Sequence, residues 1–107
     1  MKEDLKGFQK KYLRGLAHGL KPNILIGQKG LTDSLIKAID QELNLHELIK
    51  VKFNDFKEKD QKQAVMETIV ERTGCSPVGM IGHTAVIYRE NHDPEKRKIK
   101  VPVRASS

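Results

Sequence analysis

The chain has one segment whose residue types and spacing predict binding chemistry: Gly27, Gln28, Lys29 and Gly30, called the glycine loop below. Glycine tolerates positive φ and carries no side chain, so a sugar–phosphate backbone can approach bare peptide there. A segment with helical periodicity follows, and the first amides of a helix lack intrahelical partners and favour anions. Lys29 adds a mobile cation. The pattern predicts a loop that clamps single-stranded RNA, and a plain tight turn between a strand and a helix is the alternative.

The charge of the chain favours the same class of partner. Its 107 residues include 20 Lys and Arg against 14 Asp and Glu, for a formal net charge of +6. An excess of positive charge favours a polyanion. Lys10, Lys11 and Arg14, on a predicted first helix, are further candidates for phosphate contacts; a solvated helix face is the alternative.

The remaining reactive side chains show no catalytic or metal-binding spacing. Cys75 is the single cysteine, so an internal disulfide is excluded, and a lone cysteine is typical of a protein in a reducing cytosol. It follows a predicted helix C-terminus, where the helix dipole disfavours a reactive thiolate. The four histidines are scattered and accompany no cysteine pair, which argues against zinc. The glycine spacing is also not that of a P-loop. We therefore expect no enzyme, no catalytic residue, no cofactor and no metal site.

The expected location is the cytoplasm, because the first residues contain no apolar leader region and no run approaches a membrane span. A chain of this length is expected to form one monomeric domain with a single core. Its hydrophobic fraction of 37% and charged fraction of 32% suit a globular protein with a heavily charged surface.

Hydrophobic periodicity predicts three helices and four strands. Apolar residues at helical spacing predict helices over 3–17 and 57–73, the latter ended by Gly74, and another that Thr32 caps. The apolar stripe of the first helix is Leu5, Phe8, Tyr12, Leu13 and Leu16. The predicted strands are a buried one at 23–26, a half-solvated one at 47–53 with Lys50 and Lys52 on its wet face, and two, 78–81 and 85–88, joined by a type II′ turn at Gly82 and His83.

This order, α-β-α-β-α-β-β, predicts a compact α/β domain with a mixed four-stranded sheet and three packed helices. The β-α-β portions are expected to be parallel, and the last two strands an antiparallel hairpin. The domain is expected to span residues 1–91. Residues 92–107 form a basic tail, in which alternating apolar residues predict either a short edge strand or an ordered extension.

Four motifs at consistent spacing identify a family resemblance: LRGLAHGLKP at 13–22, IGQKGL at 26–31, HELIKVK at 46–52 and IGHTAVIYR at 81–89. Together they resemble the CRM domain, and in particular the stand-alone bacterial CRM proteins of the YhbY type. The resemblance covers residues 5–89 without a large insertion. It departs from the family in two places: the tail after Asn91 lies outside the match, and Gln28 stands where family loops often have a basic residue.

The resemblance implies a fold similar to the C-terminal domain of a bacterial translation initiation factor. It also implies that Gly27, Gln28, Lys29 and Gly30 contact RNA beside a basic surface on the first helix, which carries Lys10, Lys11 and Arg14. Bacterial members of this family are associated with precursors of the large ribosomal subunit. The implied partner is therefore ribosomal RNA, and the implied function is assistance in large-subunit assembly.

Two other functions remain open from the residues. The basic face is also suited to docking on an acidic ribosomal protein or assembly factor. Alternatively, the same RNA-binding chemistry would serve a translation regulator that binds messenger or transfer RNA.

Overall fold

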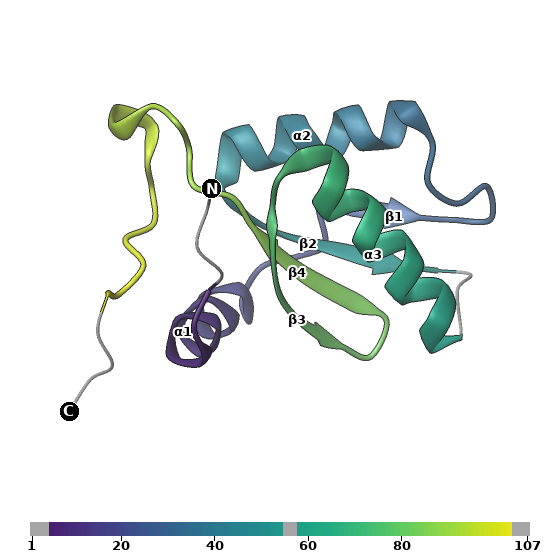
Figure 1. Cartoon of the computed structure of the whole chain (residues 1–107), viewed down its shortest axis with the longest axis horizontal. Coiled ribbons are helices and arrows are strands. Elements are labelled where there is room, and N and C mark those ends of the chain that lie inside the picture. Colours follow the sequence, from purple (N-terminus) through teal and green to yellow (C-terminus); the bar gives the residue numbers. More distant parts are fainter. Residues whose placement is uncertain (1–4, 55–57, 104–107) are drawn as a thin grey trace.

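The computed structural model describes residues 5–54 and 58–103. The described residues form three α-helices and four strands, followed by a short 3-10 helix (Figure 1): α1 (Gly7–Ala17), β1 (Ile24–Ile26), α2 (Asp33–His46), β2 (Leu48–Phe53), α3 (Lys59–Thr73), β3 (Ser76–Ile81), β4 (Thr84–Tyr88) and η1 (Pro94–Lys96). The predicted α/β fold with a mixed four-stranded sheet and three helices is confirmed.

The sheet has the strand order β1-β2-β4-β3, with β1 parallel to β2 and β4 antiparallel to both of its neighbours. The β3–β4 hairpin turns at Gly82, whose φ of 59° is left-handed, and His83 does not share that conformation. Positive φ at the first central residue of the turn and not at the second fits the expected type II′ turn. Insertion of β4 beside β2 leaves β1 and β3 as the two edges of the sheet, and β1 leads directly into the glycine loop.

The helices cover the two faces of the sheet unequally, as Figure 1 shows. Helices α2 and α3 pack over one face around the larger core cluster, which includes Ile26, Ile39, Ile49 and Ile69. Helix α1 lies on the other face, where Leu13 and Ala17 pack against residues of β2, β3 and β4. The position of α1 over these three strands decides which face of β1 stays open.

Several predicted element details are wrong. Helix α1 begins at Gly7, because the Lys6 backbone N–H donates to Gln9 Oε1 at 2.8 Å; residues 3 and 4 lie outside the described chain. Its predicted apolar stripe is correct only in part: Leu13 is buried and Leu5 packs against the same cluster, whereas Tyr12 and Leu16 are 43% and 42% exposed.

The other two helices have the predicted ends where backbone chemistry determines them. Thr32 Oγ1 accepts the Leu35 N–H at 3.1 Å and caps α2 as expected. Gly74, with a φ of 72°, ends α3 in the left-handed conformation that favours glycine. The start of α3 is Lys59 rather than residue 57, which lies outside the described residues.

The tail forms an ordered extension and, over its described residues, no strand. It is held by Glu47, which caps α2 instead of opening the strand predicted at 47–53. Its buried carboxylate accepts three backbone N–H groups: Asn91 at 2.7 Å, Lys98 at 2.5 Å and Ile99 at 3.0 Å. Ile99 then packs against the core cluster that Leu13 and Ala17 of α1 form with the sheet.

Candidate functional site

The glycine loop is a closed β-turn at the end of β1. The Gly30 N–H donates to the Gly27 carbonyl at 2.9 Å, and Gly30 has a φ of 70°. Gly30 is therefore required by the backbone conformation, whereas Gly27 does not adopt positive φ. Gln28 and Lys29 occupy the tip and are exposed. The turn thus presents an amide side chain and a cation to solvent, side by side.

The N-terminus of α2 follows the loop, but its charge environment is mixed. One of its free amides is already bonded to the Thr32 cap. Asp33, in the first helical turn, is 86% exposed and lies 3.5 Å from Arg72 of α3. A carboxylate at this position repels an anion placed on the helix axis, and an exposed arginine offsets it only in part. The favourable place for a phosphate is therefore the loop tip rather than the axis of α2.

A hollow of about 500 Å³ adjoins the loop and is called the loop hollow here. It is lined by the loop itself, by the first turns of α2 and by Leu25 of β1; the lining residues are Leu25, Gly27, Gln28, Lys29, Gly30, Thr32, Ser34, Leu35 and Ala38. Leu25 is 56% exposed, so the prediction that residues 23–26 form a fully buried strand is wrong on one face. The reason is that α1 packs over β2, β3 and β4.

Lys52 brings a second cation to this end of the molecule. It is the register partner of Leu25 on the parallel strand β2, and its side chain is exposed. Lys50, two residues earlier, is used differently: its amine donates to the carbonyls of Leu20 at 2.9 Å and His18 at 3.5 Å. Strand alternation places both lysines on one face, but only the structure distinguishes Lys50, which binds carbonyls of the 18–20 segment, from Lys52, which is exposed and pairs in register with Leu25 of the loop hollow.

The structure does not bring the cations of α1 to the glycine loop. Figure 1 shows α1 and the loop at opposite ends of the sheet along the long axis of the molecule. Lys10 and Lys11 are therefore part of a separate basic surface. Arg14 is partly buried, and its Nη1 donates to the Val78 carbonyl at 3.2 Å. This contact is structural and was not expected from the sequence.

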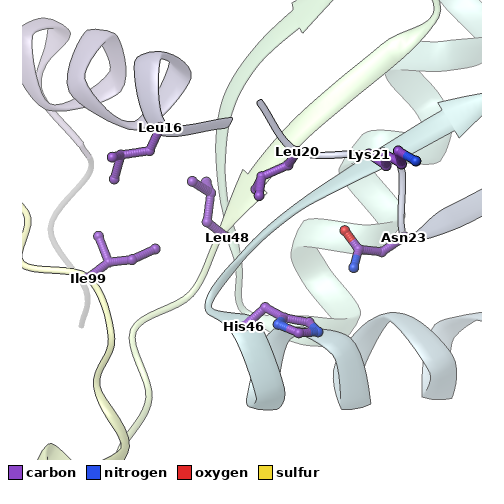
Figure 2. Close-up of a pocket in the computed structure, with 7 residues that line it drawn as sticks. All are labelled: Leu16, Leu20, Lys21, Asn23, His46, Leu48 and Ile99. Atoms are coloured by element: carbon purple, nitrogen blue, oxygen red, sulfur yellow. The ribbon is translucent and has the colours of Figure 1, made fainter. Parts of the chain in front are cut away.

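A second hollow, of about 440 Å³, lies near α1 and is called the α1 hollow. Figure 2 shows leucines from three parts of the chain converging there with one tail residue; the lining is Leu16, Leu20, Lys21, Asn23, His46, Leu48 and Ile99. His46 lies 3.9 Å from Glu42 on the same helix. The walls of this hollow are thus largely aliphatic, and Lys21 adds a cation.

Cys75 is buried, and in the described chain no three His, Cys, Asp or Glu side chains form a group able to hold a metal ion. No helix among the described residues combines the length and apolar character needed to cross a membrane.

Comparison with known proteins gives a consistent result. The CRS1/YhbY (CRM) domain family model matches residues 5–89. A Haemophilus influenzae protein named RNA-binding protein is 42% identical over 94 residues, which are 88% of this chain and 91% of that protein. A Bacillus subtilis protein with the name "Probable RNA-binding protein YqeI" is 39% identical over 92% of this chain and 99% of its own.

The fold also resembles a solved structure. The solution structure of a hypothetical Staphylococcus aureus protein, described as a candidate RNA-binding protein, superimposes with a TM-score of 0.75 at 40% identity. The similarity covers 92% of this chain and 99% of the other.

Proposed function

The chain belongs to the CRS1/YhbY (CRM) domain family, and we propose that it is an RNA-binding protein whose glycine loop holds the sugar–phosphate backbone. The observation that carries this proposal is the exposed tip of the closed Gly27–Gly30 turn, with Lys29 upon it and Lys52 near the adjoining hollow. Two cations at the rim of a concave surface attract a polyanion, and such contacts position the strand without reading its sequence.

We further propose that the RNA is ribosomal and that the protein assists assembly of the large ribosomal subunit in the cytoplasm, as a monomer that binds without catalysing a reaction. The CRM resemblance supports this choice of target. Messenger or transfer RNA is the competing target, because backbone contacts at the loop suit any exposed single strand equally well.

The direct test is cross-linking of the protein to RNA in cells, followed by RNA sequencing and gradient separation of the particles that carry it. Cross-links in large-subunit ribosomal RNA, with the protein in precursor fractions, support the assembly role. Dispersed cross-links on free messenger or transfer RNA contradict it while retaining RNA binding. An absence of cross-links above background contradicts RNA binding.

Purified protein tests the contact residues. Lys29→Ala is expected to weaken binding of all RNA sequences about equally and to reduce the slope of log K against log salt by about 0.7. Lys100→Ala, in the tail, removes the same charge far from the loop and serves as the matched control. Equal losses for both variants contradict a specific role for the loop, because net charge alone then explains the binding.

The α1 hollow favours a second candidate function, docking of a protein partner. Its exposed leucines and neighbouring Lys21 suit an acidic segment that also carries apolar side chains. Pull-downs with and without nuclease separate the two functions. Association mediated by RNA is lost after nuclease treatment, whereas direct docking survives it and is reduced by Leu16→Ser.

A further inference from the structure

We propose that the loop hollow is a binding site for one unstacked nucleobase of the RNA strand that the glycine loop holds. This inference rests on the proposed RNA-binding function and deepens it. Backbone contacts alone would accept single-stranded and duplex RNA alike, whereas a base site makes the protein select a single strand.

The walls of the loop hollow have the chemistry that a nucleobase requires. Leu25, Leu35 and Ala38 supply aliphatic surface for the flat faces of a base. Leu25 is 56% exposed, so its side chain is open to a ligand that enters the hollow. The volume of about 500 Å³ lies within the ordinary range for small-ligand sites.

Polar groups lie at the margin of the same hollow. Ser34 presents an exposed hydroxyl, and Thr32 Oγ1 accepts one backbone bond while its hydroxyl hydrogen is still able to donate. Strand β1 is an edge of the sheet, and an edge strand has backbone N–H and C=O groups on the side without a neighbouring strand. Donors and acceptors of this kind match the edge of a base, whereas a purely apolar ligand would leave them without partners.

The charges around the hollow orient the strand. Lys29 lies in the lining, and Lys52 is the register partner of Leu25. Asp33 repels phosphate from the axis of α2. The backbone is therefore favoured at the rim, between the two lysines, and its base is directed toward the leucine surface. A base within a duplex is stacked and paired on both sides, so it cannot enter without being extruded.

The experiment measures binding of fluorescently labelled RNA by the full chain. The probes are an eight-nucleotide single-stranded RNA of mixed sequence, the same strand in a duplex, and a series in which each nucleotide in turn lacks its base. The variants are Leu25→Ser and its matched control, Leu45→Ser. Leu45 is 58% exposed, close to the value for Leu25, and does not line the hollow.

We expect Leu25→Ser to weaken binding of the single strand by at least about fivefold, consistent with the loss of one base contact. Because Leu25→Ser removes no charge, the slope of log K against log salt should stay unchanged, whereas Lys29→Ala should reduce it. Leu45→Ser should bind within about twofold of the wild type. In the abasic series, the wild type should bind one RNA more weakly than the complete strand, namely the one that lacks the base at the site. Leu25→Ser should bind every RNA of the series as it binds the complete strand.

A second variant protects the test against a folding defect at Leu25. Ala38→Leu narrows the hollow from α2 and changes no residue of the loop or of β1, and it is expected to weaken binding of the single strand to a similar degree. The base site is overturned if the wild type binds duplex as tightly as single strand, or if Leu25→Ser and Ala38→Leu bind like Leu45→Ser. Absence of RNA binding by the wild type overturns the proposed function instead, so the two failures are distinguishable.

Discussion

Glu47 is the residue on which the position of the tail depends. Its carboxylate accepts three backbone N–H groups from residues 91–99, and its own φ of 64° is unusual for a side chain of this size. Glu47→Gln replaces one acceptor oxygen with an amide NH₂ group, which then faces a backbone N–H donor of the tail. We expect the free energy of unfolding to fall by about 2 kcal/mol, which urea denaturation measures.

The matched control for Glu47→Gln is Glu67→Gln, which neutralises an exposed carboxylate of α3. Trypsin provides a local readout, because Arg97 and Lys98 lie in the segment that Glu47 holds. Cleavage there should be faster in Glu47→Gln than in the control. Equal stability and equal cleavage for the two variants would mean that the tail is held by its apolar contacts alone.

Tyr88 gives a pH-dependent prediction at the same scale. Burial, with smaller contributions from Glu47 and Glu90, raises the pKa of its phenol to about 12. In the unfolded chain the pKa is 10.0, so above pH 10 the unfolded state loses this proton first and is favoured. The stability linked to Tyr88 is therefore complete below pH 10 and is lost as pH rises toward 12.

Tyr88→Phe isolates this effect. Between pH 9 and pH 11 the wild type should lose about 1 kcal/mol more unfolding free energy than the variant. Near neutral pH the change should cost little or be stabilising, because the buried hydroxyl has no hydrogen-bond partner among the described residues. Tyr12→Phe, at an exposed position, is the control. Parallel stability curves for wild type and Tyr88→Phe would contradict the raised pKa.

The sequence predicts individual residues well where local chemistry decides their role. Thr32 caps a helix, and Gly74 and Gly82 adopt left-handed conformations, because each requirement involves only neighbours in the chain. Glu47 was expected in a strand, since its three partners are 44 to 52 residues away and no local pattern indicates them.

At the scale of elements, the contact between α1 and β3 is the least predictable feature of the fold. The register of β3 against β4 shifts between Pro77 and Gly79, which leaves Val78 as the extra residue of a bulge. The Val78 carbonyl accepts a hydrogen bond from Arg14, whose side chain crosses Gly79. A basic residue on an amphipathic helix favours solvent, so the sequence alone suggested an RNA contact there.

A double-mutant cycle tests this contact. A Cβ at position 79 would lie 2.9 Å from Arg14 Cδ, so Gly79→Ala requires the Arg14 side chain to shift away from the Val78 carbonyl, and it should lower the free energy of unfolding by up to about 1 kcal/mol. Arg14→Ala removes both the clash and the bond to Val78, and it should itself cost about 1 kcal/mol. In the Arg14→Ala background, Gly79→Ala should therefore cost less than it does in the wild type.

The control for this cycle is Gly15→Ala, in the last turn of α1. No atom lies within 4 Å of a Cβ built there, so the change should stabilise the protein by about 0.5–1 kcal/mol in either background. Equal costs of Gly79→Ala with and without Arg14 would show that the bulge, rather than the arginine, excludes a larger residue at position 79.

At the scale of the whole molecule, the sequence predicts the elements, their order along the chain, the parallel pairing of β1 with β2 and the antiparallel β3–β4 hairpin, but not the strand order of the sheet. Alternation and helical periodicity depend on local spacing, whereas the insertion of β4 between β2 and β3 depends on contacts that no local pattern encodes. The consequence for the candidate site is large. The glycine loop lies between a strand and a helix, as the sequence predicts, and its contact with RNA stays a prediction, but the basic helix expected beside it lies at the opposite end of the sheet.

This separation predicts that the effect of the α1 cations depends on the length of the RNA. A strand of three nucleotides held at the glycine loop is much shorter than the 42 Å long axis of the molecule, so it should not reach α1 at the opposite end of the sheet. Lys10→Ala combined with Lys11→Ala should leave its affinity unchanged, whereas Lys29→Ala should weaken it. On a strand several times longer, both changes should weaken binding, and their free-energy effects should add because the two surfaces share no contacts.

Titration of both RNAs at a fixed salt concentration checks this prediction, and the salt slope identifies the contacts. Removing Lys10 and Lys11 should reduce the slope by up to about 1.4 on the long strand and leave it unchanged on the short one, at about 0.7 per lost phosphate contact. A loss of affinity for the short strand in the α1 variant would mean that one bound nucleotide segment reaches both surfaces, contrary to their placement at opposite ends of the sheet. No loss on either strand would assign Lys10 and Lys11 to the solvated face of α1, and the glycine loop with Lys52 would then account for the RNA-binding surface.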